Sequence, residues 1–286
     1  MNRRARLAFI AGVVVATALA GCQAPQPSKR AWPSPLPFTG LFSPFGVAVD
    51  SKGTVYLPDT GHDRVLALPA GSKSQTVLPF TGLKSPRGVA VDGRGAVYVV
   101  DHQNSRVVAL AAGATTQTVL PFTGLRSPCD VAVDSKGTAY VTDENTGKVI
   151  ALPAGSTAQT VLPFTGLSSP HGVAVDDKGT VYVADDHYAD ESDRVVALPA
   201  GSAQQTVLPY SGTGDLYGIA VDSKGNVYLS DPITEQVMAL RAGSSVNRVL
   251  QQFPSLTRPH GLAVDNEGTV FIVKTSANEV MTTEAL

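Results

Sequence analysis

The sequence has little charge, few aromatic residues and only two cysteines among its 286 residues. Charged residues make up 16% of the chain and the formal net charge is −2, so the chain lacks the basic surface that contacts to nucleic-acid phosphates require. Two cysteines are too few for a disulfide scaffold or for a zinc site with four thiolates. These absences argue against nucleic acid as a partner and exclude a disulfide scaffold and a four-thiolate zinc site.

Hydrophobic residues, glycine and proline are plentiful. Hydrophobic residues make up 43% of the chain, which is ample for a buried core, so the chain is not disordered. The 27 glycines and 20 prolines indicate many turns. This composition favours a β-rich fold over a helical one.

The N-terminus has the pattern of an export signal. Three arginines within the first six residues precede an uncharged apolar run, Leu7 to Ala20, which is too short to span a bilayer. The run ends in Leu19-Ala20-Gly21-Cys22, which resembles a bacterial lipobox. The resemblance implies a lipoprotein signal peptide at 1–21, a lipidated Cys22 and a polar, proline-rich tether up to residue 33. The alternative is an ordinary secretory signal with a chance cysteine, and the export route, Sec or twin-arginine, stays open.

A repeat of about 42 residues fills the chain from residue 34 to residue 286. The motif Ala-Val-Asp ends at Asp50, Asp92, Asp134, Asp176, Asp222 and Asp265. The second copy shows four apolar segments between turn residues, at 88–92, 96–101, 106–110 and 117–122. Short β-branched and aromatic segments punctuated by Gly, Asn, Asp and Pro predict four strands per repeat.

Six repeats of four antiparallel strands predict an all-β, six-bladed β-propeller. An alanine stands in the middle of the first strand of every copy, where inner strands crowd around the axis. The last copy lacks its fourth strand, whereas residues 35–41 carry one before the first copy begins. We therefore expect the N-terminal strand to complete the last blade, which would remove exposed sheet edges. The ring then forms one domain at 34–286.

The repeated phrases Pro-x-Gly-Val-Ala-Val-Asp, Gly-x-Val-Tyr-Val-x-Asp and Arg-Val resemble the NHL repeat. The phrase Gln-Thr-Val-Leu-Pro-Phe-Thr-Gly-Leu, at 75–83, 117–125 and 159–167, resembles the extracellular sensor propeller of the mycobacterial receptor serine/threonine kinase D. The resemblance implies a free-standing, lipid-anchored sensor module. It implies no phosphotransfer, because the chain has no kinase motifs.

Aspartates end the second strand of five copies, and a basic residue usually follows five residues later. Asp59 precedes Arg64, for example, and the last copy reverses the signs with Lys274 and Glu279. This swap predicts ion pairs across a hairpin rather than a catalytic row. We expect exposed pairs that each contribute little to stability.

The fourth copy has four extra residues in the loop 185–193. The loop is acidic, and its position on a rigid scaffold favours partner binding. The residues proposed for this role are Asp186, His187, Tyr188, Asp190 and Glu191. The alternatives are a solvated acidic loop and a calcium site, because carboxylate oxygens suit that ion.

A second variable set precedes the first strand's glycine, near the expected axial opening. The set comprises Phe45, Arg87, Cys129, His171, Tyr217 and His260, with Asp130 replacing the glycine in the third copy. Its guanidinium and aromatic rings favour a small anionic or aromatic ligand. Alternatively, Cys129, His171 and His260 bind zinc in a metal-dependent lyase or hydrolase. Lactonase-type propellers bind calcium through several axial carboxylates, and apart from Asp130 this ring offers none.

Taken together, the pattern predicts a monomeric lipoprotein on the outer face of the bacterial cell membrane, with no resident cofactor. Its propeller would bind an envelope protein or a small ligand. We expect the binding face to carry the axial set and the loops 60–63, 102–105, 144–147, 186–193, 232–235 and 275–278, because each strand pair returns the chain to the same side. The alternatives are the metal-dependent enzyme and a structural role in which the tether spaces envelope components.

Overall fold

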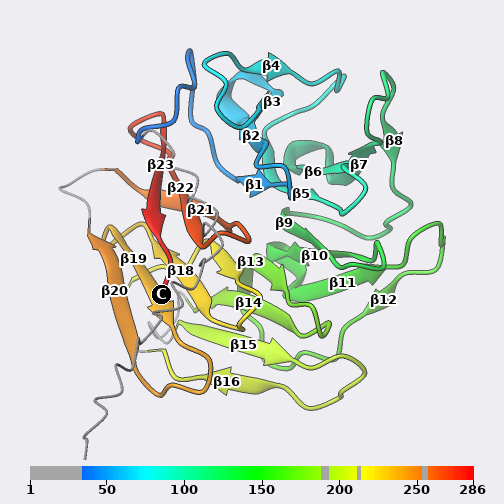
Figure 1. Cartoon of the computed structure of the whole chain (residues 1–286). Helices are drawn as coiled ribbons and strands as arrows, with labels where there is room; N and C mark the ends of the chain where they lie inside the picture. Colours follow the sequence, from blue (N-terminus) through cyan, green and yellow to red (C-terminus); the bar gives the residue numbers. More distant parts are fainter. Residues whose placement is uncertain (1–33, 188–192, 211–213, 253–256) are drawn as a thin grey trace, which may run out of the picture. The chain divides into compact units, whose positions relative to one another are not determined.

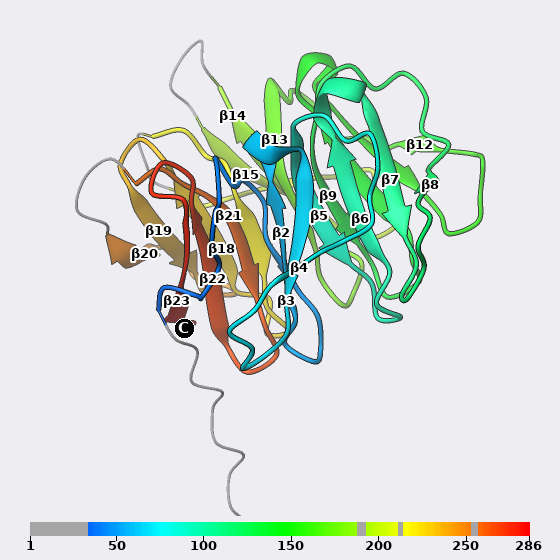
Figure 2. The ribbon, with the colours of Figure 1, turned by 90° about the horizontal axis from the view of Figure 1, so that it is seen from above.

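The computed structural model describes residues 34–187, 193–210, 214–252 and 257–286. Six antiparallel sheets surround a central axis, which confirms the predicted all-β, six-bladed propeller. Inner strands such as β5, β9 and β13 lie near the middle in Figure 1, and outer strands such as β8, β12 and β16 lie at the periphery. Figure 2 shows the strands along their length, with neighbouring blades side by side. No helix in these ranges is both long enough and apolar enough to cross a membrane.

Each blade follows the order of the chain, from an inner to an outer strand. Blade one contains β1 (Ala48–Val49), β2 (Val55–Asp59), β3 (Arg64–Leu68) and β4 (Thr76–Val77). Blade two contains β5 (Pro86–Val91), β6 (Val97–Asp101), β7 (Arg106–Leu110) and β8 (Thr118–Val119). Blade three contains β9 (Pro128–Val133), β10 (Ala139–Asp143), β11 (Lys148–Leu152) and β12 (Thr160–Val161). Blade four contains β13 (Ser169–Val175), β14 (Val181–Asp186), β15 (Arg194–Leu198) and β16 (Thr206–Leu208).

Blade five contains β17 (Ile219–Val221), β18 (Val227–Asp231), β19 (Gln236–Leu240) and β20 (Asn247–Gln252). Blade six contains β21 (Pro259–Val264), β22 (Thr269–Lys274) and β23 (Glu279–Glu284). Three short 3₁₀ turns follow the second strands of the first three blades: η1 (Thr60–His62), η2 (His102–Asn104) and η3 (Glu144–Thr146).

The Ala-Val-Asp motif is explained by the hairpin that it opens. Asp50 Oδ1 accepts hydrogen bonds from the backbone N–H groups of Lys52 and Thr54, at 2.9 and 2.8 Å. Asp50 Oδ2 accepts a third from the Tyr56 hydroxyl at 3.1 Å, and Gly53 takes a positive φ of 80° in the turn. A side chain that satisfies its own turn favours that turn over other local structures. The repeated aspartate therefore specifies the first hairpin of each blade.

The hydrophobic core lies between blades. Val55, Leu57 and Leu66 of blade one, all fully buried, pack with Phe271 and Val273 of blade six. Tyr56 and Val65, on the opposite faces of the same strands, pack against blade two. Because each blade is covered on both sides, its middle strands are apolar on both faces, as the sequence predicts.

The N-terminal segment occupies the expected fourth position of the last blade. The Leu36 N–H donates to the Val280 carbonyl of β23 at 2.8 Å, and Leu36 is buried against Phe271 and Val280. The pairing is shorter than in the other blades, since Ser34 and Pro35 form no strand. Pro35 has no N–H to donate, which limits the ladder at this position. The closure of the ring is therefore confirmed in position. Among the residues from 34 onward, one backbone hydrogen bond joins the N-terminal segment to β23 in place of a full strand.

The aspartates that end the second strands form the predicted ion pairs in three blades, but their predicted exposure is wrong. The Nε–Oδ2 distances are 2.7 Å for Arg64 and Asp59, 2.6 Å for Arg106 and Asp101, and 3.0 Å for Arg194 and Asp185. Each of these aspartates is completely buried. The reversed pair, Lys274 and Glu279, also forms, at 2.9 Å. In blade three, Lys148 lies opposite Asp143 in register but makes no described ion pair with it.

The burial has a structural reason. Each carboxylate also accepts a backbone N–H from the segment that leads into its blade, such as Lys84 N to Asp101 Oδ1 at 2.6 Å. The aspartate therefore joins, by hydrogen bonds, the segment that precedes the inner strand to the hairpin between the second and third strands. The arginine supplies the opposite charge that a buried carboxylate requires.

Candidate functional site

The inner strands approach one another closely at their first glycines. The Gly46 N–H donates to the Arg87 carbonyl at 3.1 Å, and the Gly261 N–H donates to the Phe45 carbonyl at 2.9 Å. A Cβ added at Gly46 would lie 2.5 Å from the Arg87 oxygen, closer than real Cβ atoms come. Glycine is therefore required by contact between blades, and the residue before it is held at the axis.

An axial cavity of roughly 70 Å³ lies at this end of the propeller. Its lining includes five of the six variable axial residues, Phe45, Cys129, His171, Tyr217 and His260. The volume accommodates a few water molecules, far less than the roughly 300–1,000 Å³ typical of sites for drug-sized ligands. A larger ligand would therefore rest on the mouth of the cavity rather than enter it.

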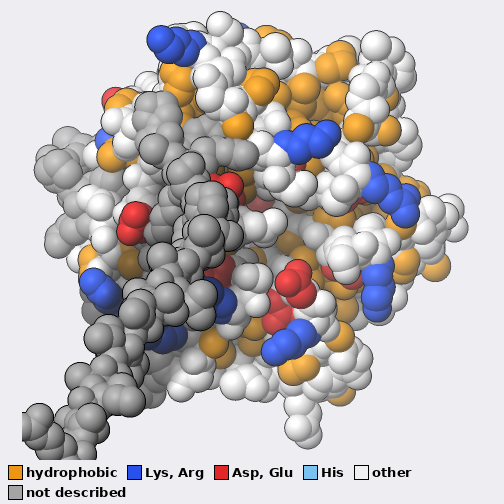
Figure 3. Space-filling model, viewed as in Figure 1, with side chains coloured by type: hydrophobic (Ala, Val, Ile, Leu, Met, Phe, Trp, Pro, Cys, Tyr) orange, Lys and Arg blue, Asp and Glu red, His pale blue; other side chains and the backbone are white. Residues whose placement is uncertain are grey.

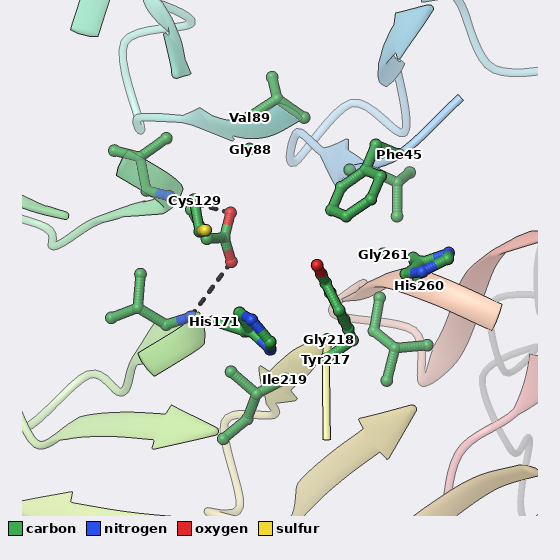
Figure 4. A pocket seen from close by; sticks show the side chains of 17 residues that line it. Phe45, Gly88, Val89, Cys129, His171, Tyr217, Gly218, Ile219, His260 and Gly261 are labelled. Carbon is green, nitrogen blue, oxygen red and sulfur yellow. Dashed lines mark hydrogen bonds between the residues drawn. The ribbon is translucent and has the colours of Figure 1, made fainter. Parts of the chain in front are cut away.

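Aromatic rings fill the mouth. His171 stacks on Tyr217 with ring centroids 4.1 Å apart, and His260 stacks on Phe45 at 4.7 Å. Tyr217 meets Phe45 and His260 edge to face, at 5.3 and 4.7 Å. Figure 4 shows Tyr217 between the two histidines. His171 is buried, whereas Phe45, Tyr217 and His260 keep partial exposure and form the apolar walls of the mouth.

The structure does not bring Cys129, His171 and His260 together as a metal-ligand set. Tyr217 separates the two imidazoles, and each imidazole has partners elsewhere. His260 Nδ1 lies 2.8 Å from the Thr275 hydroxyl, and His171 Nδ1 lies 3.2 Å from the Leu216 carbonyl. Burial also raises the pKa of the Cys129 thiol to about 12, which disfavours the thiolate that zinc binds. In the described ranges, the group of three or more His, Cys, Asp or Glu residues with converging ligand atoms lies elsewhere, at Asp186, Asp193 and Asp215.

Arg87 supplies the cation of the mouth. Its guanidinium lies 5.3 Å from the Phe45 ring centroid and donates a weak hydrogen bond to Cys129 Sγ at 3.8 Å. Among the described residues no carboxylate forms an ion pair with it, in contrast to Arg64 and Arg106. A guanidinium without a carboxylate partner, placed over an aromatic face, is suited to bind a planar anion.

Glu144, at the start of η3, joins this site. The sequence places its loop, 144–147, on the binding face but does not single out this residue. Its Oε2 accepts hydrogen bonds from Cys129 Sγ at 3.5 Å and from the Ser127 hydroxyl at 3.3 Å, and Oε1 lies 4.0 Å from His171 Nε2. The contact with His171 is the largest cause that lowers the pKa of Glu144, to about 2, so this carboxylate is ionised at neutral pH. Arg87 lowers the same pKa, which places a cation and an anion at one mouth.

A sequence signal for Glu144 exists. The residue after each strand-ending aspartate varies from copy to copy, as the axial residues do, and in blades one to three its side chain reaches the neighbouring inner strand. The Thr60 hydroxyl donates to the Pro86 carbonyl at 2.5 Å, and His102 Nδ1 lies 2.9 Å from the Pro128 carbonyl. The turns η1, η2 and η3 therefore lie on the same face as the mouth, as the repeat predicts.

Asp130 replaces the axial glycine in blade three and bridges two blades. Its carboxylate accepts the N–H of Val131 at 2.9 Å and the N–H of Val173, in the next blade, at 3.1 Å. Burial raises its pKa to about 7 despite these two hydrogen bonds. Its carboxylate thus serves the contact between blades three and four.

The acidic loop of blade four is described only at its ends. His187 Nε2 lies 3.0 Å from Asp185 Oδ2, and Asp186 is buried at the end of β14. Tyr188, Asp190 and Glu191 lie outside the described residues, as does Cys22. The proposed partner-binding role of this loop therefore stays a prediction.

The face drawn in Figure 3 carries both signs of charge. Outside the grey atoms, several acidic side chains lie towards the centre, and lysines and arginines are spread around them. This face therefore shows no continuous basic stripe of the kind that follows a nucleic-acid backbone.

Comparisons with known proteins agree on the fold. The sequence profile described as the SMP-30/gluconolactonase/LRE-like region matches residues 45–285. A gluconolactonase from Xanthomonas campestris superposes with a TM-score of 0.69 at 19% identity, over 87% of this chain and 88% of that one. Virginiamycin B lyase from Staphylococcus aureus gives 0.62 at 12% identity, over 85% and 84%. A chain of the nidogen/laminin complex gives 0.66 at 24% identity, over 77% and 84%. No curated protein sequence matches the chain significantly.

Proposed function

Since the chain belongs to the SMP-30/gluconolactonase/LRE-like family, we propose that the mouth of its axial cavity binds a small planar anion. The observation that carries the proposal is the Arg87 guanidinium, which has no described carboxylate partner and lies 5.3 Å from the Phe45 ring centroid. The guanidinium would bind a carboxylate, and the exposed parts of Phe45, Tyr217 and His260 would contact the planar part of the ligand.

The binding role fits an anchored sensor. The lipobox-like Cys22 and the tether to residue 33 support a place at the outer face of the bacterial membrane, where the NHL-like propeller would meet envelope ligands. Fractionation of cells into membrane and soluble parts checks this location.

The first test compares three small probes on the full-length protein, purified in detergent. Benzoate carries both features of the proposed ligand, cyclohexanecarboxylate lacks the aromatic plane, and benzamide lacks the charge. We expect benzoate to bind more tightly than either of the others in a calorimetric titration.

Replacement of the guanidinium is the matching variant. Arg87→Ala should weaken benzoate binding by about 10-fold to 100-fold, because a hydrogen bond to a charged group contributes about 1.5–3 kcal/mol. The matched control is Arg94→Ala, since Arg94 lies in the exposed Asp92–Gly95 turn at the other end of the strands. Equal affinity of wild type and Arg87→Ala would contradict the proposed role of the mouth.

A second candidate is a ring-opening hydrolase or lyase, like the enzymes named among the structural neighbours. The contact that favours it is the ionised Glu144 carboxylate beside His171, a pair suited to accept and donate protons. The calcium chemistry that lactonase-type propellers use does not fit this mouth. Both Asp130 oxygens accept backbone N–H groups, and Glu144 contacts Cys129 and Ser127, so no set of axial carboxylates is available to an ion.

The enzyme candidate has its own measurement. If it is right, the full-length protein hydrolyses glucono-δ-lactone above the spontaneous rate, and Glu144→Gln lowers kcat by at least 100-fold while benzoate binding persists. A rate equal to the spontaneous rate for both proteins would exclude lactonase activity towards this substrate and leave the binding proposal intact.

A further inference from the structure

A second cluster of ionisable side chains lies where blade four meets blade five, and shares no residue with the axial mouth. Asp186 ends β14, Asp193 directly precedes β15, and Asp215 lies in the segment that leads into β17. One carboxylate oxygen from each of the three lies within 4.8 Å of the others. Oxygens that share one calcium ion at 2.3–2.6 Å lie up to about 5 Å apart, so this spacing matches a common ion.

A fourth carboxylate adds a buried, unsatisfied oxygen at the same place. Asp231 is 1% exposed; its Oδ1 accepts the N–H groups of Ile233 and Thr234 at 3.0 and 2.8 Å, whereas its Oδ2 has no described hydrogen-bond partner. The Asp231 carboxylate lies against Gly214, the residue before Asp215. A buried carboxylate oxygen without a donor is costly unless a cation or proton compensates it.

The repeat shows what is missing around Asp231. The equivalent carboxylates Asp59, Asp101 and Asp185 each pair with the arginine that begins the next strand. Asp143 has no described ion pair, but both of its oxygens accept backbone N–H groups. In blade five the residue opposite Asp231 is Gln236, which carries no charge. Among the described residues, no lysine or arginine forms an ion pair with Asp193, Asp215 or Asp231.

A further unsatisfied oxygen lies at the junction of blades four and five. Tyr210 packs against the core cluster that contains Leu216 and Ile219, and its buried hydroxyl oxygen has no described hydrogen-bond partner. A divalent cation at this junction would supply the positive charge that arginine supplies in blades one, two and four.

We propose that Asp186, Asp193 and Asp215 bind a calcium ion at the junction of blades four and five, with Asp231 beside it as an additional negative charge. All the protein donors are carboxylate oxygens, which suit a hard cation and not zinc. The ion would fix the end of the acidic loop against the segment 214–217, which ends at Tyr217 of the mouth. The site uses no residue on which the binding of benzoate depends, so the two proposals stand or fall separately.

The test is a calorimetric titration of Ca²⁺ alone into the full-length protein, after EGTA has been used and removed. We expect one ion per chain, a higher Tm with Ca²⁺, and at least 10-fold weaker binding of Mg²⁺, which tolerates only octahedral geometry and dehydrates reluctantly. Asp215→Asn should weaken Ca²⁺ binding by at least 10-fold, because one ligand charge is lost. Asp193→Asn should do the same and serves as the second variant if Asp215→Asn fails to fold.

The matched control is Asp177→Asn, since Asp177 is an exposed carboxylate in the β13–β14 turn of the same blade. Its affinity for Ca²⁺ should equal that of wild type. Absence of Ca²⁺ binding at millimolar concentration, equal binding by wild type and both cluster variants, or binding of Mg²⁺ as tight as that of Ca²⁺ would overturn the assignment.

Discussion

Replacement of Asp101 by alanine is expected to lower the free energy of unfolding by about 3–5 kcal/mol, the cost of breaking a buried ion pair by removing one partner. The Asp101 carboxylate is completely buried and accepts hydrogen bonds from the Lys84 N–H at 2.6 Å, the Asn104 side-chain amide at 2.8 Å and Arg106 Nε at 2.6 Å. The variant leaves all three donors without this acceptor. Urea unfolding followed by circular dichroism measures the loss.

The control for Asp101→Ala is Asp177→Ala, in which an exposed carboxylate is removed. That change should alter stability by less than about 0.5 kcal/mol. Equal stability of the two variants would mean that the strand-ending aspartates are exposed pairs of little energetic weight, as the sequence pattern had suggested.

Substitution of Gly46 by alanine is expected to cost about 1–3 kcal/mol, the usual penalty for overpacking a closely packed region. The added Cβ would lie 2.5 Å from the Arg87 carbonyl and 3.3 Å from the Gly88 Cα, and these are backbone atoms that cannot move aside without shifting a blade. The hydrogen bond from the Gly46 N–H to the Arg87 carbonyl would lengthen as well. Thermal unfolding of the full-length protein reports the effect.

Gly93→Ala is the matched glycine control. Gly93 lies in a turn with no atom within 4 Å of an added Cβ and no positive φ, so the substitution should be neutral or slightly stabilising. If Gly46→Ala were as stable as Gly93→Ala, the inner strands would be further apart than the structure places them, and the axial residues would not be held in mutual contact.

The fold was predictable because its signals repeat. An alanine at the middle of each inner strand, as at Ala90 and Ala132, and an aspartate at each first hairpin recur with the period of a blade, and both have direct structural causes. The position of the closing N-terminal segment was predictable for the same reason. The burial of Asp59 and its equivalents was not predictable. The sequence shows complementary charges, but it does not show that a backbone N–H from the preceding segment also donates to each carboxylate and covers it.

The site was predictable in part. The repeat assigned Phe45, Tyr217 and His260 to one axial mouth. However, strand register fixes only the backbone position of a residue and not its side-chain conformation. Which way each ring turns depends on its neighbours, so the sequence could not show that Tyr217 separates His171 from His260. The loop 144–147 was expected on this face, but the sequence could not single out Glu144, because its contacts with Cys129 and His171 depend on how the side chains turn.

The acidic cluster lay further beyond sequence reasoning. Asp186 and Asp193 come from one irregular loop and Asp215 from the next lead-in segment, where insertions break the repeat. Spacing along the chain therefore carried no information about their distance in space. Only the packing of blade four against blade five brings the three carboxylates together.

The account rests on the axial mouth as a site for a planar anion, and a crystal structure of the full-length protein with bound benzoate tests it most directly. The predicted result is a carboxylate within hydrogen-bond distance of the Arg87 guanidinium and a ring in contact with Phe45, Tyr217 or His260. Benzoate bound at any other surface, with the mouth of the axial cavity holding solvent alone, would contradict the account.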